Sequence, residues 1–142
     1  MKIIAFDLGD VHTGIARADE LGFCAAPYTT VDTKNLISWI EQAITDNLFD
    51  TVVIGLPKTL KGTDSQQTIK VIEYKENLEK RFPTIIWILW DERLTSKQAR
   101  ALRPQKIKRD KEKEHAIAAA LILQGYLESV HYKQNSTIDN AI

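Results

Sequence analysis

Apolar residues in this sequence form short runs typical of β-strands, followed by longer stretches with helical spacing. The first short runs occupy residues 2–6, 14–18 and 23–31 and are separated by turns rich in glycine and polar residues. Because only short turns join these runs, the economical arrangement is an antiparallel meander of three strands. The first run stops at Asp7, so the sequence predicts a strand that ends in a carboxylate.

The remainder of the chain alternates between helix and strand patterns. Helices are expected over residues 35–48 and 64–82, and strands over residues 51–55 and 84–90. The last of these strands is nearly continuous in apolar residues, as expected for a strand covered on both faces, and Glu92 follows it. A second carboxylate is thus predicted close to a strand end.

The C-terminal part is predicted to be mainly helical. A helix is expected over residues 95–102, and a strongly apolar helix from Glu114 to Val130. The segment that follows has no apolar periodicity. We therefore expect a single domain over residues 1–130 and a flexible tail over residues 131–142.

Strands first, then alternating helices and strands, predict an α/β fold with a mixed sheet of five strands or so. Ligands of such open sheets usually bind outside the carboxyl ends of the parallel strands. Asp7 and Glu92 are expected to meet at that edge. The length of 142 residues suits one domain with one site.

Composition places few limits on the partner but several on the compartment. The chain is 44% hydrophobic and 27% charged, with no apolar run near the ~20 residues that a membrane helix needs. The N-terminus reaches Asp7 after a few apolar residues and lacks a signal-peptide cleavage site. We expect a cytoplasmic protein outside the membrane. Cys24 is the only cysteine, which excludes an internal disulfide, and we expect it to be a small buried hydrophobe.

Charge is balanced overall but not locally. The chain has 19 basic and 19 acidic residues, yet residues 93–113 hold nine basic residues against two acidic ones, a local excess of seven. The basic residues of this block are Arg93, Lys97, Arg100, Arg103, Lys106, Lys108, Arg109, Lys111 and Lys113. Such a block suits a phosphate backbone, although a solvated flexible loop would have the same composition.

The two carboxylates suggest metal chemistry. Phosphodiester hydrolysis requires an activated water and stabilised charge on the phosphate, which divalent cations supply. Hard cations such as Mg²⁺ prefer oxygen ligands, and carboxylates at uncovered strand ends provide them. Asp7 and Glu92 meet this requirement, but turns favour aspartate for ordinary hydrogen-bonding reasons too.

Six short segments together resemble the YqgF family. They are residues 5–9, 14–16, 53–57, 62–63, 91–95 and 118–124, and they occur in that family's order and spacing. The resemblance covers roughly Lys2 to Ser129. It implies an RNase H-like fold, in which helices flank a central five-stranded mixed sheet, and metal-dependent nuclease chemistry with Mg²⁺ or Mn²⁺.

The resemblance also implies a nucleic-acid substrate. Members of the family are described as Holliday-junction resolvases and as nucleases that mature the end of pre-16S ribosomal RNA. Cleavage of pre-16S rRNA at its 5′ end is the leading hypothesis, and resolution of branched DNA is the alternative. Junction resolution needs a homodimer, whereas trimming an RNA end needs only a monomer. A degenerate nuclease fold that serves as a nucleic-acid-binding module is the third reading.

The resemblance implies three acidic positions. The first falls on Asp7 and the second on Glu92, but this chain departs from the family pattern at the third. Where the family has aspartate, this chain has His115, preceded by Glu114. Three readings remain open: His115 is itself a ligand, Glu114 takes the place of the family's aspartate, or the site binds metal weakly and has lost some activity. Imidazole suits Mn²⁺ better than Mg²⁺. We take Asp7, Glu92 and His115 as the catalytic and metal-binding set.

Several basic residues are candidates for phosphate contacts. Lys58 and Lys61 lie in a loop that resembles a family segment, although a simple glycine turn would explain it as well. Arg93 follows Glu92 and is suited to phosphate or to an ion pair. From the basic block we select Lys106, Lys108 and Arg109. His12 lies in a turn near Asp7 and is expected to be exposed to solvent instead of catalytic.

Overall fold

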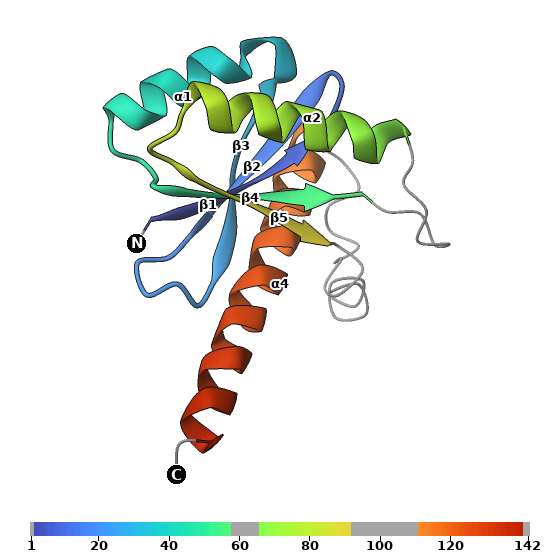
Figure 1. Cartoon of the computed structure of the whole chain (residues 1–142). Helices are drawn as coiled ribbons and strands as arrows, with labels where there is room; N and C mark the ends of the chain where they lie inside the picture. Colours follow the sequence, from blue (N-terminus) through green and yellow to red (C-terminus); the bar gives the residue numbers. More distant parts are fainter. Residues whose placement is uncertain (1, 58–65, 92–110, 141–142) are drawn as a thin grey trace.

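A mixed β-sheet lies between two helices on one face and a third, longer helix on the other (Figure 1). The computed structural model describes residues 2–57, 66–91 and 111–140. Its strands are β1 (Ile3–Leu8), β2 (His12–Ala18), β3 (Ala25–Asp32), β4 (Thr51–Leu56) and β5 (Ile86–Asp91). Its helices are the 3-10 turn η1 (Thr33–Asn35), α1 (Leu36–Thr45), α2 (Gln66–Arg81) and α4 (Lys111–Asn140).

The strands of the sheet lie in the order β3-β2-β1-β4-β5. The antiparallel pairs β1–β2 and β2–β3 form the meander, and β1, β4 and β5 are parallel. The expected meander and mixed sheet are therefore confirmed. Most element boundaries differ by a few residues from the predicted ones, and two of these differences bear on the site: β1 continues through Asp7 to Leu8, and His12 already belongs to β2.

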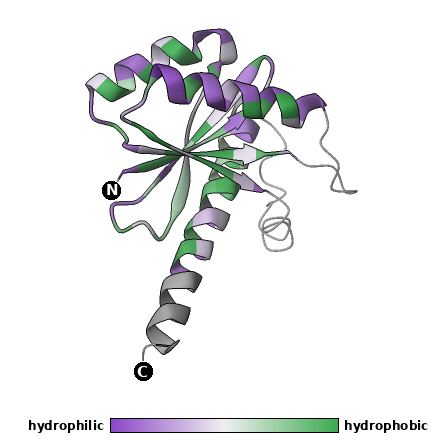
Figure 2. Ribbon diagram, viewed as in Figure 1, coloured by the Kyte–Doolittle hydropathy of each residue, from purple (hydrophilic) through white to green (hydrophobic). Residues whose placement is uncertain are grey.

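Alternation along β1 divides the core between the two faces of the sheet. Ile4 and Phe6 pack in the cluster that includes α1 and α2, whereas Ile3 and Ala5 pack in the cluster that includes α4. Asp7 continues the second set, because side chains two residues apart share a face. Its carboxylate therefore lies on the face that α4 covers. Hydrophobic residues colour much of the sheet and the part of α4 that crosses it, whereas α2 is more hydrophilic (Figure 2).

The start of α4 lies directly against β2 at Gly14. Gly14 is paired with Asp7 across the β1–β2 ladder. A Cβ atom at Gly14 would overlap the backbone carbonyl of His115 and the backbone nitrogen of Ala116. The missing side chain at Gly14 thus allows the helix backbone to approach the strand, next to Asp7.

The C-terminal helix is longer than expected from the sequence. The predicted helix ends at Val130, but the backbone of α4 stays helical to Asn140. No glycine or proline interrupts the chain after Gly125, so nothing in the backbone forces the helix to end. His131, placed in the expected flexible tail, stacks on Phe23 with ring centroids 4.3 Å apart. Its Nε2 atom lies 2.8 Å from the carbonyl oxygen of Gly22.

Other expectations are met only in part. β5 contacts both core clusters through its alternating side chains, as predicted, but it is an edge strand. Cys24 is exposed, so the prediction of a buried cysteine is wrong. It lies in the hairpin before β3, where few neighbours cover it. The helix expected over residues 95–102 lies outside the described residues. Within the described part of the chain, no helix is both long and apolar enough to cross a membrane.

Gly14→Ala should destabilise the fold strongly, because the new methyl group must displace the backbone of α4. We expect the free energy of unfolding to fall by about 3 kcal/mol. Gly22→Ala is the matched control: its Cβ meets nothing within 4 Å, but Gly22 has φ of 74°. That strain should cost only ~1–2 kcal/mol. Urea unfolding of both variants tests this, and equal losses would contradict the close approach of α4.

Candidate functional site

Asp7 and His115 form the centre of the candidate site. Asp7 lies near the carboxyl end of β1, and His115 lies on α4, whose backbone passes over Gly14 beside it. Burial raises the pKa of the Asp7 carboxyl group above its ordinary value, and the nearby charge of His115 offsets part of this rise. A half-buried carboxylate thus lies next to an imidazole near the carboxyl end of a central parallel strand, where the sequence predicted the site.

His12 adds a second imidazole to the site. Its ring centroid lies 5.4 Å from that of His115, with 45° between the ring planes. Its Nδ1 atom lies 3.3 Å from Oδ1 of Asp32 on β3. The side chains of His12 and Asp32 are 44% and 48% exposed, so this pair adds little to stability and mainly orients the ring. The prediction that His12 is exposed to solvent is therefore right only in part, because one side of its ring faces His115.

A chain of hydroxyl groups fixes the turn that follows β1. Oγ1 of Thr33 donates to the carbonyl oxygen of Gly9 at 2.7 Å and lies 2.9 Å from Oγ1 of Thr13. A hydroxyl group has one proton, so Thr13 must be the donor to Thr33. Thr13 is fully buried, and its hydroxyl is satisfied by this bond. Sequence reasoning missed these two threonines, because only the β2–β3 pairing brings them together.

The structure describes only part of the predicted residue set. Glu114 is exposed on α4, next to His115 in sequence. β5 ends at Asp91, which is paired with Leu56 of β4. Strand β4 lies between β5 and β1. The remaining predicted site residues lie outside the described residues: Lys58, Lys61, Glu92, Arg93, Lys106, Lys108 and Arg109.

The donors present determine how well a metal would fit. Among the side chains of residues 2–57, 66–91 and 113–131, no group of three histidine, cysteine, aspartate or glutamate residues is arranged to hold a metal ion. Asp7 and His115 supply two donors, one oxygen and one nitrogen. This pair suits Mn²⁺ better than Mg²⁺, and a complete site requires at least one further ligand.

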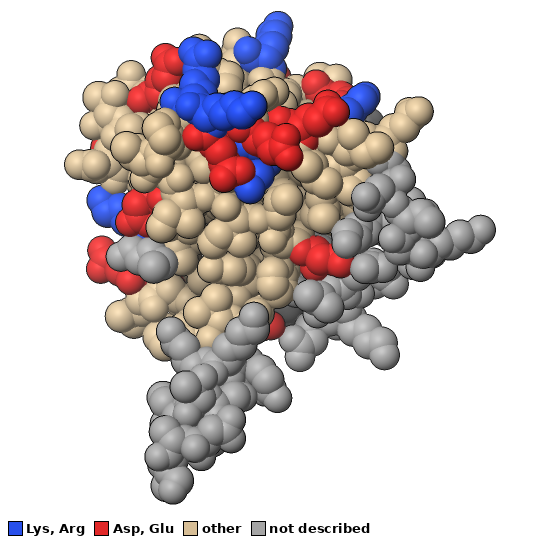
Figure 3. All heavy atoms as spheres, in the orientation of Figure 1, with Lys and Arg blue, Asp and Glu red and all other residues tan. Residues whose placement is uncertain are grey.

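The face formed by α1 and α2 does not carry one sign of charge. Lys, Arg, Asp and Glu side chains alternate over these helices, and little charge is seen over the centre of this view (Figure 3). Several are paired, as in Arg81 with Glu41 at 3.1 Å and Lys75 with Glu79 on the same helix. A broad basic surface is therefore absent from this face of the described residues.

Known proteins resemble this chain over most of its length. A family model described as RuvX, Holliday junction resolvase, matches residues 1–129. A Clostridium tetani protein named "Putative pre-16S rRNA nuclease" is 40% identical over 139 residues, covering 94% of this chain and 100% of the relative. A Clostridium novyi protein of the same name is 38% identical over 136 residues, covering 92% of this chain and 100% of the relative.

A solved structure supports the fold. The fowlpox virus resolvase, in complex with Holliday junction DNA, superposes with a TM-score of 0.55 at 15% sequence identity. The match covers 92% of this chain and 99% of the viral one. At such low identity the likeness concerns the fold alone, and it confirms the RNase H-like arrangement expected from the sequence.

Asp7→Asn should stabilise the metal-free protein at neutral pH. Because the folded-state pKa of Asp7 is raised, the folded state holds its proton more tightly than the unfolded state does. The protonated carboxyl group therefore contributes to the free energy of unfolding. This contribution is complete at a pH below the ordinary pKa of 3.8 and is lost as the pH rises through the folded-state pKa. We expect a higher Tm for the variant at pH 7 with chelator, and no advantage at pH 3. A lower Tm at pH 7 would contradict the desolvation of Asp7.

Proposed function

The chain belongs to the RuvX family, which is also called YqgF, and from this premise we propose that it is a metal-dependent nuclease. Its proposed reaction is phosphodiester hydrolysis during maturation of the 5′ end of pre-16S ribosomal RNA. The observation that carries the proposal is the half-buried carboxylate of Asp7, placed beside His115 at the carboxyl end of a central parallel strand. A cytoplasmic location is part of this proposal, since ribosomal RNA is processed there.

The choice of RNA over branched DNA rests on the relatives. Two proteins that are 38–40% identical over their whole length are named for pre-16S rRNA. The family description and the viral structure point to Holliday junctions, but the viral protein is only 15% identical. Branched DNA is therefore the second candidate substrate. It would require a homodimer, whereas the RNA reaction is compatible with a monomer.

We propose that Asp7, Glu92 and His115 hold the divalent cation. A cation bound there would activate a water molecule and stabilise charge on the cleaved phosphate. Asp7 would contribute its negative charge, and a bound cation would offset the cost of burying that charge. His115 would bind through a neutral imidazole, whose ring nitrogen supplies the lone pair that a metal ligand needs.

Substrate affinity is proposed to come from the basic residues. The whole chain has zero net charge and residues 93–113 carry an excess of seven, so the remainder carries a net charge of minus seven. Attraction to a phosphate backbone must therefore come mainly from this block. Within this block, and in the segment that follows β4 in the sequence, we assign backbone contacts to Lys58, Lys61, Arg93, Lys106, Lys108 and Arg109.

Asp7→Asn should abolish cleavage of a pre-16S 5′-end substrate, because it removes a ligand's charge without changing its size. We expect the rate to fall by roughly a thousandfold. Asp46→Asn, an exposed carboxylate at the end of α1, is the matched control and should retain the wild-type rate. Full activity of Asp7→Asn would sink the assignment.

His115 should make the enzyme prefer Mn²⁺ over Mg²⁺. His115→Asp restores the carboxylate of the family pattern and should raise Mg²⁺-supported cleavage, whereas His115→Ala should lose activity with both ions. Glu114→Gln is the matched neighbour and should have no effect. The opposite result, loss with Glu114→Gln and none with His115→Ala, would assign the ligand to Glu114.

One assay separates the competing functions. Wild type is given the RNA end and a four-way DNA junction with each metal, and its mass in solution is measured. Cleavage of the RNA by a monomer supports the proposal. Cleavage of the junction by a dimer supports the second candidate, and binding without cleavage under every condition supports a degenerate fold.

A further inference from the structure

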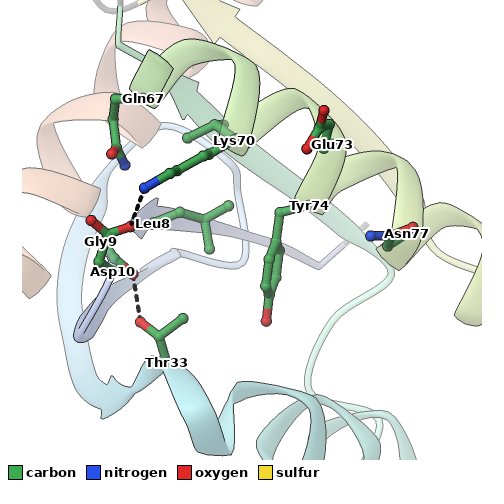
Figure 4. A pocket seen from close by; sticks show the side chains of 10 residues that line it. Leu8, Gly9, Asp10, Thr33, Gln67, Lys70, Glu73, Tyr74 and Asn77 are labelled. Atoms are coloured by element: carbon green, nitrogen blue, oxygen red, sulfur yellow. Dashed lines mark hydrogen bonds and ion pairs between the residues drawn. The ribbon is translucent and has the colours of Figure 1, made fainter.

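A cavity of about 340 Å³ lies between the β1–β2 turn and α2 (Figure 4). Its lining residues Leu8 and Val71 pack in the cluster that includes α1 and α2, on the face of the sheet opposite the one that Asp7 faces. Its walls are the turn at Gly9 and Asp10, Thr33 at the start of η1, and one side of α2. We call it the α2 pocket. Its volume falls at the lower end of the range for small-molecule sites, about 300–1,000 Å³, so it suits a single ring system.

One stripe of α2 supplies most of the polar groups. Gln67, Lys70, Tyr74 and Asn77 are spaced three, four and three residues apart, so they lie along one side of the helix. Their neighbours Thr68, Val71 and Leu78 are buried and attach the helix to the sheet. The pocket is thus bordered by a helix whose position the core fixes.

The charges around the pocket do not favour a phosphate ligand. One cation, Lys70, is set against two anions, Asp10 and Glu73, which leaves a local charge of minus one. The Lys70 Nζ atom lies 3.9 Å from Oδ1 of Asp10, and both side chains are more than 60% exposed. A neutral polar ligand meets less repulsion here than an anion does.

The uncharged groups match the edges and faces of a nucleobase. Tyr74 projects from α2 into the pocket and is partly buried against the core (Figure 4). Burial raises the pKa of its hydroxyl group, which therefore remains a neutral donor and acceptor. Aromatic side chains stack on unpaired bases. The amides of Gln67 and Asn77 lie on either side of Tyr74, ~15 Å apart along the helix at 1.5 Å per residue, and each offers a donor and an acceptor to the edge of a base stacked nearby.

One wall of the pocket, the turn at Asp10, is close to Asp7 along the chain. Asp10 is three residues from Asp7, a path of at most ~11 Å at 3.8 Å per residue. The hydrogen bond from Thr33 to the Gly9 carbonyl holds in place the turn that separates Asp7 from the pocket. A strand crossing this turn would present one nucleotide to Asp7 and a neighbouring one to the α2 pocket.

We propose that the α2 pocket receives one unpaired nucleobase of the substrate strand, from a nucleotide next to the bond that is cut. This inference rests on the proposed nuclease function, and it deepens that function by assigning a base subsite. The enzyme then requires an unpaired nucleotide at a fixed distance from the cleaved bond.

The test measures binding, so that it does not depend on turnover. Asp7→Asn protein is titrated with Mn²⁺ present against a short single-stranded oligoribonucleotide of the 16S 5′ flank, with each position in turn made abasic. We expect one abasic position to weaken binding about tenfold, because a stacked base is lost there. Adding Gln67→Ala and Asn77→Ala should weaken binding of the intact strand three- to tenfold, roughly, and remove most of that abasic effect.

Neighbouring residues on α2 provide the controls. Gln66→Ala and Glu76→Ala alter exposed side chains that do not line the pocket, and they should leave the abasic profile unchanged. A flat profile, or an abasic effect that persists in the Gln67→Ala/Asn77→Ala protein, would overturn the base subsite. If either result is found and wild type still cleaves the RNA, the base subsite is rejected and the proposed nuclease function is retained. If wild type neither binds nor cleaves it, both fall.

Discussion

The close approach of the α4 backbone to Gly14 is the contact on which the rest of the site depends. No side chain separates β2 from the helix there, so the carbonyl of His115 can lie directly over the strand. Asp7, the ladder partner of Gly14, is thereby covered on one side and faces the imidazole. Any residue larger than glycine would push α4 away from the sheet and separate the two groups. One backbone contact therefore sets both the packing of the second core cluster and the geometry of the candidate site.

Burial of Asp7 opposes stability for the same reason that it favours cation binding. A desolvated carboxylate is costly in the empty protein, and its raised pKa expresses that cost. A bound cation would remove much of the penalty, so this position favours function over stability. The fold tolerates the cost because the surrounding strands are well packed, with Phe6 and Ile15 fully buried on the opposite face.

The β1–β2 turn connects the two halves of the proposed mechanism. Asp7 faces α4 on one side of the sheet, and the α2 pocket lies on the other. Thr13 and Thr33 fix the turn between them through hydroxyl bonds. A rigid turn would keep the reacting phosphate and the neighbouring base at a constant separation, which is what positioning of a flexible strand requires. The described surface over α1 and α2 is mixed in charge, so affinity is assigned to the basic block instead.

The sequence by itself determined the elements and the main acidic position. Apolar periodicity is local, so it predicted the meander, the parallel strands and the helices that flank them, and it placed Asp7 at a strand end. The family pattern also identified His115 as the unusual third position. Strand boundaries at Asp7 and His12 were missed, because polar residues that face a site break the apolar pattern. Only the tertiary structure decided which distant residues meet. His12 with Asp32 and His115, Thr13 with Thr33, and His131 with Phe23 are joined by strand register and helix placement. The exposure of Cys24 and the α2 pocket have the same origin. Register and placement arise from packing over the whole chain, and no local pattern records them.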